Sequence, residues 1–443
     1  MSITRLGKML AILAVLAAAF LVVSASAESK ARIVRLSDVQ GTVQIDRAAG
    51  DGFDKAFLNL PVIEAARVKT GKDGRAEVEF EDGSALRLAP DSEVDFIRLA
   101  LGEDGQKLST VQLVSGTVYA SLHPKNAREK SDQFLLNFGR ESVTVSEAAH
   151  FRVELADATA TLAVFKGKLS ATTPSGQFEV AEKHSATIDL GNNELTKDDP
   201  ARKDTFVIAK NYAAEPSDDW DRQQTDYHDR YAPASGSSIS SPYGYGMSDL
   251  NYYGNFMTVP GYGNVWQPYF SGANWSPFQD GAWAFYPGAG YMFVSGYPWG
   301  WMPYNYGNWA FAPGFGYVWQ PGNWNSWNAL PVVVNAPVTM KVPAPPVSGR
   351  QTVMVGRGLA ANPAMGGTHR LTINPGSASF GVPRGSVNHL DRLSKTMERT
   401  ARPVVVATFP PAPATSFGAS PTTSTGLTAA PHRSSASAPT RPR

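Results

Sequence analysis

Four aromatic side chains near the middle of the chain are the candidates for direct contact with a ligand. Trp275, Trp299, Trp301 and Tyr304 lie in a segment dominated by glycine, proline and aromatic residues. Indole and phenol rings offer flat apolar faces with a polar edge, on which sugar rings can stack. These residues predict a glycan-binding platform for an envelope polysaccharide such as peptidoglycan. The residue pattern favours a second interpretation, in which the periodic aromatics pack on one another as a core.

No set of residues in the sequence has the spacing of a known catalytic or metal site. There is no Walker loop, G-x-S-x-G elbow, H-E-x-x-H helix or EF-hand loop. The chain has no cysteine, which excludes a thiol nucleophile, a thiolate metal site and disulfide bonds. Paired carboxylates for glycoside hydrolysis could converge only in the fold. We expect a protein that is not an enzyme and has no cofactor or metal. The histidines are scattered, without metal-ligand spacing, at His123, His150, His184, His228, His369, His389 and His432.

The net charge of +1 conceals three zones of different composition. Residues 28–231 hold 26 Lys and Arg against 35 Asp and Glu, a net of −9. Residues 232–330 hold no Lys or Arg and only Asp249 and Asp280, whereas residues 331–443 hold 12 basic and 2 acidic residues, a net of +10. Because the aromatic zone has no basic side chain, a phosphate or nucleic-acid ligand is not expected there.

The aromatic zone contains a repeat of one short unit. "GNFMTVPGYGNVWQP" (254–268), "GAWAFYPGAGYMFVS" (281–295) and "GNWAFAPGFGYVWQP" (307–321) share their glycines, Pro-Gly turn and aromatic positions, with periods of 27 and 26 residues. Each unit reads as a strand, a turn rich in left-handed positions, and a returning strand. The repeat therefore predicts three β-hairpins that share an aromatic core. We expect Trp299 and Trp301 to alternate across one strand.

A helix is predicted between the two β-rich zones, over residues 215–231. Ser217 can cap it, with acidic residues following in the first turn. Trp220, Tyr227 and Tyr231 fall on one face, which predicts a strut that packs its aromatic face on a neighbour. His228 is expected to be solvated or capping.

Residues 31 to about 190 have the alternation of an antiparallel β-structure. In "RAEVEFEDGSALRL" (75–88), apolar residues alternate with Glu77, Glu79, Glu81 and Arg87, so the charged face is expected to lie in water. Asp-Gly pairs at 73–74, 82–83 and 104–105 predict tight turns. Further strands are expected at 111–122, 142–146, 150–155, 160–171, 176–182 and 185–190.

This zone resembles the FecR domain of bacterial envelopes. The resemblance rests on "GTVQI" (41–45), "VKTGKDGRAEVEFEDGSALRLAP" (68–90), "VQLVSGTVYASL" (111–122) and "VFKGKLSAT" (164–172), and covers roughly 150 residues. It implies a β-rich binding or scaffolding module without catalytic residues. The best-known members regulate iron-transport genes through a cytoplasmic segment that contacts a sigma factor. We do not expect that role here, because a cleavable signal takes the place of such a segment.

The sequence departs from the FecR pattern at one point and resembles a second domain further on. Ala149 and His150 stand where the family usually has Gly-Thr, which puts the local turn in question. From the helix onward, "YYGNFMTVPGYGNVW" (252–266) and "YPWGWMPYNYGNW" (297–309) resemble an uncharacterised aromatic domain that often follows FecR domains. Phe256 stands where that pattern usually has tryptophan. This resemblance implies an architecture and no activity.

Both ends of the chain predict segments outside the folded body. Residues 1–27 have the basic, apolar and A-x-A parts of a secretory signal, although an uncleaved anchor is an alternative. No later segment has transmembrane length, so a periplasmic or extracellular location is expected. Residues 331–443 are rich in Pro, Ser and Thr and are expected to be mostly disordered, with a short helix within 379–400. The basic charge of this tail could bind acidic polysaccharide or the acidic zone of the chain.

Together these patterns predict an all-β protein: a FecR-like antiparallel sandwich or roll, a short linking helix, an aromatic β-hairpin domain and a disordered basic tail. The predicted boundaries are a signal peptide at 1–27, the FecR-like domain at 28–200, a linker with the helix at 201–240, the aromatic domain at 241–330 and the tail at 331–443. The predicted function is non-enzymatic binding or scaffolding at the bacterial cell envelope, with an envelope polysaccharide or envelope protein as partner. The alternatives are a glycan-binding protein that uses exposed aromatics, and a signalling regulator related to the iron-transport FecR proteins. The patterns indicate no particular oligomeric state.

Overall fold

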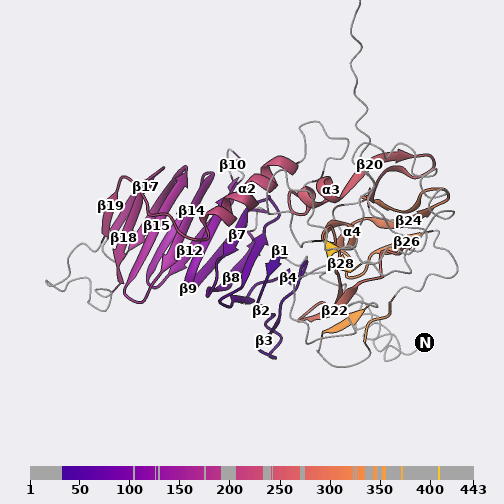
Figure 1. Cartoon of the computed structure of the whole chain (residues 1–443), viewed down its shortest axis with the longest axis horizontal. Coiled ribbons are helices and arrows are strands. Elements are labelled where there is room, and N and C mark those ends of the chain that lie inside the picture. The colour runs from indigo at the N-terminus through magenta and orange to yellow at the C-terminus, as the bar shows by residue number, and fades with distance from the viewer. Residues whose placement is uncertain are drawn as a thin grey trace, which may run out of the picture.

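A computed structural model describes most of residues 32–334 and four short stretches beyond them (Figure 1). The gaps are residues 103–104, 125, 128–129, 174–175, 191–205, 233–240, 242, 270–274, 323 and 325–326, and the later stretches are 343–346, 352–355, 371–372 and 408–409. The predicted signal and the predicted helix within 379–400 lie outside the described residues. Within them, no helix is long and apolar enough to cross a membrane.

The N-terminal part is an elongated sandwich of two antiparallel β-layers that share one long strand. We call the first the open layer. From edge to edge it contains β3 (Phe53–Lys55), β2 (Val43–Asp46), β5 (Arg67–Thr70), β8 (Glu93–Leu101), β9 (Lys107–Leu122), β12 (Gln133–Phe138), β13 (Glu141–Val145), β16 (Lys168–Thr173) and β17 (Gly176–Ala181). The pairing of β9 with β12 is parallel, and the other pairs are antiparallel.

The second layer is named the covered layer, because α2 (Asp218–Tyr231) lies on its outer face. From edge to edge it contains β4 (Pro61–Val62), β1 (Val34–Gln40), β6 (Arg75–Glu79), β7 (Ala85–Leu88), β9, β14 (Ala149–Leu155), β15 (Thr159–Lys166), β18 (Ser185–Asp189) and β19 (Phe206–Ala209). The predicted linker thus contributes its first strand, β19, to the sandwich.

Gly116 lets β9 pass from one layer to the other. The first half of β9 pairs with β8 and β12, and the second half pairs with β7 and β14. Gly116 has φ +81°, and a Cβ atom there would lie 2.5 Å from the carbonyl oxygen of Asp91. Gly167, with φ +81°, makes a similar change of layer and divides the strand predicted over 160–171 into β15 and β16. The predicted turn at 73–74 likewise links β5 and β6 of different layers, whereas 82–83 is a true hairpin turn.

The apolar residues of both layers meet in one core, as the alternation predicts. Val78, Leu86, Val111 and Phe151 are among its fully buried members. The outer faces differ. The open layer exposes its outer face, whereas the charged outer face of the covered layer is buried beneath α2. The prediction that the charged alternating residues of β6 and β7 lie in water is therefore wrong.

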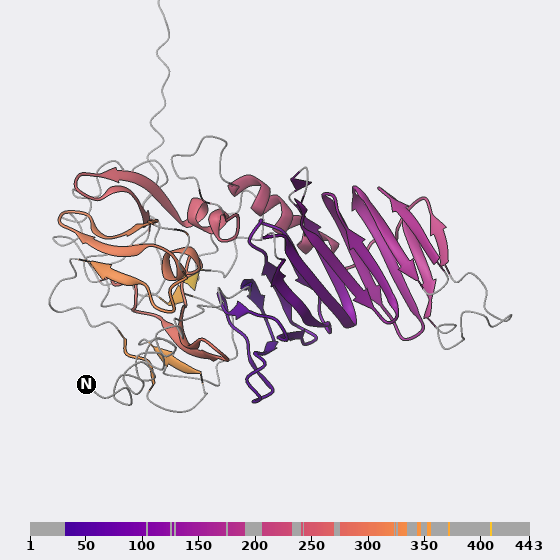
Figure 2. The same cartoon turned by 180° about the vertical axis from the view of Figure 1, so that it is seen from behind.

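The aromatic part lies at one end of the sandwich, opposite β19 (Figures 1 and 2). Its three hairpins are confirmed, and each brings an aromatic pair into the same register: Phe256 with Trp266, Trp283 with Phe293, and Trp309 with Trp319. The strands are β20 (Gly254–Val259) with β21 (Gly263–Pro268), β22 (Gly281–Tyr286) with β23 (Gly290–Ser295), and β24 (Asn308–Ala312) with β25 (Gly316–Gln320).

The first and third hairpins join in one sheet, and the second stands apart. β21 pairs with β25, and β24 also pairs in parallel with β26 (Val332–Val334). β22 pairs with β27 (Val353–Val355), so two strands of this part lie beyond the predicted boundary at residue 330. Two short helices that the β-pattern did not predict, α3 (Met247–Tyr253) and α4 (Met302–Asn305), complete the part. Small pairs form between β10 (Asn126–Ala127) and β11 (Lys130–Ser131), and between β28 (Leu371–Thr372) and β29 (Thr408–Phe409).

Candidate functional site

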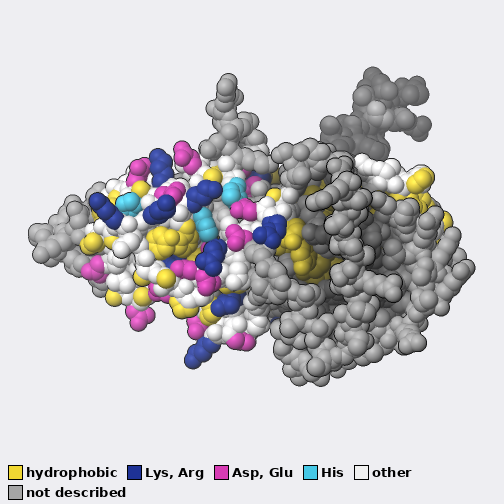
Figure 3. Space-filling model, turned by 45° about the horizontal axis from the view of Figure 1, so that its top comes forward, with side chains coloured by type: hydrophobic (Ala, Val, Ile, Leu, Met, Phe, Trp, Pro, Cys, Tyr) yellow, Lys and Arg dark blue, Asp and Glu magenta, His cyan; other side chains and the backbone are white. Residues whose placement is uncertain are grey.

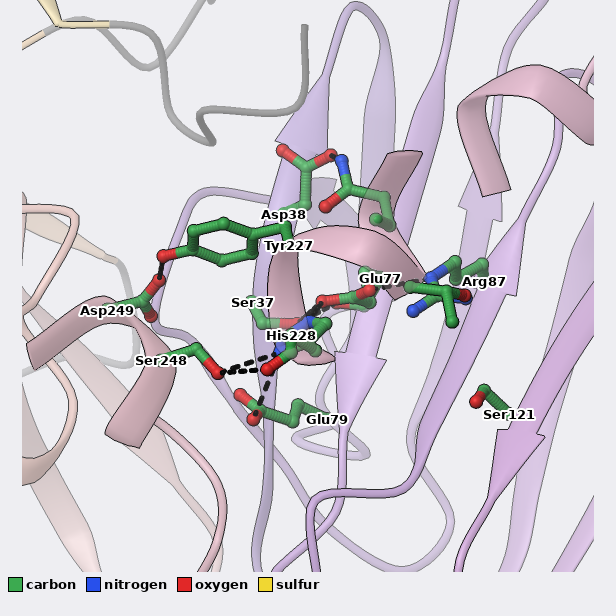
Figure 4. A network of polar contacts seen from close by, with 12 residues as sticks. Ser37, Asp38, Glu77, Glu79, Arg87, Ser121, Tyr227, His228, Ser248 and Asp249 are labelled. Atoms are coloured by element: carbon green, nitrogen blue, oxygen red, sulfur yellow. Dashed lines mark hydrogen bonds and ion pairs between the residues drawn. The ribbon is translucent and has the colours of Figure 1, made fainter. Parts of the chain in front are cut away.

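The candidate site is a chain of charged side chains buried between the covered layer and α2 (Figure 4). Alternation along each strand turns every second side chain of β1, β6, β7 and β14 toward the helix. The buried face of α2 carries polar residues that contact these side chains. The network contains Arg35, Asp38, Glu77, Glu79, Arg87, His150 and Arg152 from the strands, Asp218, Asp221, Tyr227 and His228 from α2, and Asp249 from α3.

Arg87 lies at the centre of the network and joins the sheet to the helix. Its Nε donates to Glu77 Oε2 at 2.7 Å, and its Nη1 donates to Asp221 Oδ1 at 2.7 Å. The second oxygen of Asp221 lies 2.6 Å from His150 Nε2. The side chains of Arg87, Glu77 and Asp221 are 1–3% exposed, so each charge depends on its protein partners for stabilisation. His150, at the position that departs from the FecR pattern, thus has a defined partner on α2.

His228 connects α2 to both glutamates of β6. Its Nε2 lies 2.8 Å from Glu77 Oε1, and its Nδ1 lies 3.8 Å from Glu79 Oε1. The hydroxyl of Ser37 donates to the same Glu77 oxygen at 2.6 Å. His228 was expected to be solvated or capping, and that expectation is wrong, because the sheet and the helix enclose its ring.

Arg35 carries the network across to the aromatic part. Its Nη2 lies 2.7 Å from Glu79 Oε2 and also contacts Asp249 Oδ2. Tyr227 donates its hydroxyl to the other oxygen of Asp249 at 2.7 Å. Arg35 is fully buried. Asp249 is one of only two acidic residues in 232–330, and it is used to bind the sandwich and α2 at once.

Further contacts hold the two parts together beside this ion pair. Asn59 Nδ2 donates to the carbonyl oxygen of Tyr297 at 2.8 Å, and Tyr286 donates its hydroxyl to the carbonyl of Pro61 at 2.7 Å. The side chains of Tyr286 and Met292, from the second hairpin, belong to the same apolar core as the sandwich. The junction therefore combines apolar packing with buried polar contacts, and the two parts share one core.

Burial and neighbouring charges shift the acid–base equilibria of the network. Burial alone lowers the pKa of His228, but the charge of Glu77 outweighs it and raises that pKa to about 9. Burial raises the pKa of Glu77, but His228 and Arg87 outweigh this and hold that pKa well below its usual range. His228 is thus a cation and Glu77 an anion at neutral pH, which makes their contact a true ion pair.

Asp38 is the exception in the network, because no cationic side chain of the described residues pairs with it. The amides of Gln40 and Gln224 both donate to its Oδ2, at 2.7 and 3.1 Å, and its buried Oδ1 has no hydrogen-bond partner among the described residues. Burial, reinforced by the charge of Glu77, raises the pKa of Asp38 to about 7. This carboxyl therefore titrates near neutral pH at the contact between β1 and α2.

The arrangement is suited to locking parts of the protein together. Apart from Asp38, each carboxylate of this network contacts an arginine or a histidine. Within the described residues, no group of three or more His, Asp or Glu side chains is placed to hold a metal ion. The outward face of α2 carries exposed Asp219, Arg222 and Asp226, and Figure 3 shows basic and acidic side chains interspersed over this side of the sandwich.

The four residues predicted to contact a glycan lie inside the aromatic core. Trp275, Trp299, Trp301 and Tyr304 are 0–5% exposed, so they present no ring face for stacking in this structure. Tyr297 stacks on Trp299 with a centroid distance of 5.0 Å. Trp299 and Trp301 do not alternate across a strand, because they lie in the turn that leads into α4. Their positions agree with the core interpretation of the repeat.

The sequence patterns did not predict the network, because its strand residues and its α2 residues are far apart in the sequence. The helical face of Trp220 and Tyr227 was predicted, and both are buried. The same face carries Asp221, Gln224 and His228, spaced by three and four residues. Polar residues on a helix face that is predicted to be buried indicate buried hydrogen-bond partners. Here those partners are the alternating charged side chains of β6 and β7.

The comparisons with known proteins agree with this division of the chain. Residues 66–170 match the family model described as FecR protein, and residues 247–345 match a family of unknown function that carries the designation DUF6600. The chain therefore contains a FecR domain followed by a domain of that second family, as the resemblance predicted. No curated protein matches the chain.

Two solved structures are similar to part of the chain. Both are crystal structures of a protein from Parabacteroides distasonis described as an anti-sigma factor, at 2.50 and 1.65 Å resolution. Each is 13% identical, with TM-scores of 0.27 and 0.26. The similarity covers 35% and 33% of this chain, and 63% and 60% of those chains. The chain thus spans less than two thirds of the length of either structure.

Proposed function

We propose that this chain, in which a FecR domain precedes an aromatic domain of unknown function, is a non-enzymatic protein of the bacterial cell envelope that presents a rigid surface to a binding partner. The observation that carries the proposal is the buried ion network that joins the FecR domain, α2 and the aromatic domain. A protein that only tethers two independent modules has no need of a shared core at their junction. Such a junction suits a body whose parts must keep one relative orientation.

The chemistry of the network supports binding or scaffolding over catalysis. An active site keeps a reactive group within reach of a substrate, with its protonation state tuned for transfer. Here Glu77, Arg87, Asp221 and His228 neutralise one another beneath a helix. The location in the envelope is supported by the three parts of the secretory signal in residues 1–27.

A signalling role is the second candidate, and the FecR family match favours it. In that case the protein would bind a partner outside the cytoplasm and transmit the binding signal to a regulator of transcription. The two candidates differ in what the loss of the protein changes. A scaffold supports the integrity of the envelope, whereas a signalling protein changes the transcription of target genes.

A deletion strain complemented with variants tests the proposal. We expect deletion to increase the permeability of the envelope to a hydrophobic dye. The wild-type chain and Arg222→Ala, which alters an exposed pair, should restore the barrier, and Arg35→Met should not. An alkaline phosphatase fusion should be active, because that enzyme folds only outside the cytoplasm. Unchanged permeability with altered transcription of a sigma-dependent reporter would favour signalling, and cleared zones in a peptidoglycan zymogram would contradict the non-enzymatic assignment.

A further inference from the structure

Among the described residues, the outer face of the open layer is an uncovered sheet surface, and it carries apolar side chains on β8, β9 and β12. Ile97 and Val114 are 53% and 45% exposed, and both occur at irregularities in the pairing of β8 with β9. By register, Leu108 and Leu135 are half-buried neighbours of Ile97 around Thr110, and the outward pair of Asp95 and Gln112 separates Val114 from this apolar cluster. The covered layer buries its charges, and the open layer exposes apolar groups. An exposed apolar patch on a sheet marks an interaction surface.

We propose that this face is the contact between two copies of the chain, which pack their open layers against each other. The face extends over nine strands of the described part of the chain. With strands about 4.8 Å apart and about five residues of about 3.3 Å each, its area is about 700 Å². A stable protein interface buries about 800 Å² per partner. The face is therefore close to the size that a dimer needs, and two sheets can pack with their strands about 30° apart.

The charges on the face are compatible with contact between identical copies. The acidic FecR zone as a whole has a net charge of −9, which opposes self-association. The outward charges of the open layer are five basic and four acidic, so the face itself has a net charge of only +1: Lys55, Arg67, Lys69, Arg98 and Lys168 with Asp46, Glu93, Asp95 and Glu179. Two such faces meet with little like-charge repulsion, because the charges of both signs are interspersed and the net charge of each face is small.

A second copy fits the face better than a glycan does. Among the described residues of these nine strands, no aromatic side chain is exposed. Phe53 is partly buried, with Arg67 and Lys69 placed over its ring at 4.7 and 4.3 Å. Sugar recognition relies on open ring faces, whereas the apolar contacts that Ile97 and Val114 offer are typical of the packing between two sheets.

The test measures the mass of the full chain in solution by sedimentation velocity at micromolar concentration. We expect a dimer for the wild-type chain and at least about tenfold weaker association for Ile97→Glu and Val114→Lys. The matched control is Val207→Lys, because Val207 is 71% exposed on β19 at the far end of the sandwich. This control should dimerise as the wild type does.

A cross-linking experiment keeps the proposal testable if a charged variant folds poorly. The chain has no cysteine, so Val114→Cys introduces a single thiol. Mild oxidation should convert this variant to a covalent dimer and leave Val207→Cys without a covalent link. A monomeric wild-type chain, or equal association of all variants, overturns the proposal. Retention of a monomer on immobilised envelope polysaccharide that depends on Ile97 and Val114 also overturns it, and would assign the face to a glycan.

Discussion

Replacing Arg35 with methionine tests whether the FecR and aromatic domains form one cooperative unit. Methionine keeps the unbranched apolar stem of arginine and removes the guanidinium. Glu79 and Asp249 would then face each other across the junction without the cation between them. Removing one partner of a buried ion pair costs about 3–5 kcal/mol, because an uncompensated charge stays buried. We therefore expect Arg35→Met to lose about that much free energy of unfolding at pH 7.

The expected loss is large enough to measure by thermal unfolding with two probes. For domains of about 150–250 residues, each kcal/mol shifts Tm by about 2–4 °C, which gives a fall of about 6–20 °C. Nine of the ten tryptophans lie between Trp266 and Trp327, so tryptophan fluorescence reports the aromatic domain. Far-UV circular dichroism reports the strands of the sandwich. In the wild-type chain we expect the two transitions to coincide.

The control Arg222→Ala and the pH dependence of the loss show whether it comes from the buried ion pair of Arg35. Arg222→Ala removes an exposed pair in which Arg222 and Asp219 are 68% and 75% exposed, and should change Tm little, because such pairs contribute about 0.5 kcal/mol or less. Burial already raises the pKa of Glu79, and the loss of the Arg35 cation raises it further. The loss in Arg35→Met should therefore shrink at pH 5, where a proton can neutralise Glu79. If Arg35→Met loses less than about 1 kcal/mol of free energy of unfolding, or if its fluorescence transition is unchanged, the reasoning that the junction depends on Arg35 is refuted.

Three further predictions concern the network and the aromatic core. The pKa of His228 is raised from 6.5 to about 9, so its charged form stabilises the fold by about 3 kcal/mol. This contribution is complete below pH 6.5 and is lost as the pH rises through 9. Urea unfolding at pH 6 and pH 10 should show this loss in the wild-type chain and not in His228→Gln. The raised pKa of Asp38, about 7, makes its ionised form unfavourable in the fold, so Asp38→Asn should raise Tm at pH 8 relative to wild type and have less effect at pH 5. Trp309 and Trp319 are both fully buried, but of the two only Trp319 donates a hydrogen bond from its Nε1, to the carbonyl of Tyr306 at 2.8 Å. In chemical unfolding, Trp319→Phe should therefore lose about 1 kcal/mol more free energy of unfolding than Trp309→Phe. Equal losses in the two variants would contradict this prediction.

Local pattern was enough to predict most strands and the three hairpins, because both depend on short-range rules. Strand alternation fixes which side chains share a face, and the Pro-Gly-x-Gly turns fix the hairpins. The errors arose where tertiary context overrides these rules. The strand predicted over 160–171 divides at Gly167 because the chain changes layer there. The charged face of β6 was placed in water because alternation alone cannot show that a helix about 140 residues later covers it.

The buried network needs an explanation other than stability, since well-packed apolar residues of similar volume often stabilise a protein as well as a buried ion pair does. An apolar contact between α2 and a sheet would allow the helix to slide or rotate with little penalty. Asp221 and His228 are seven residues apart, about 10.5 Å along the helix, and each has a fixed partner, in Arg87 and in Glu77. A shift by one turn would leave both charges buried and unpaired. We infer that the network sets the position of α2, and through Asp249 the orientation of the aromatic domain, more than it adds to the free energy of folding.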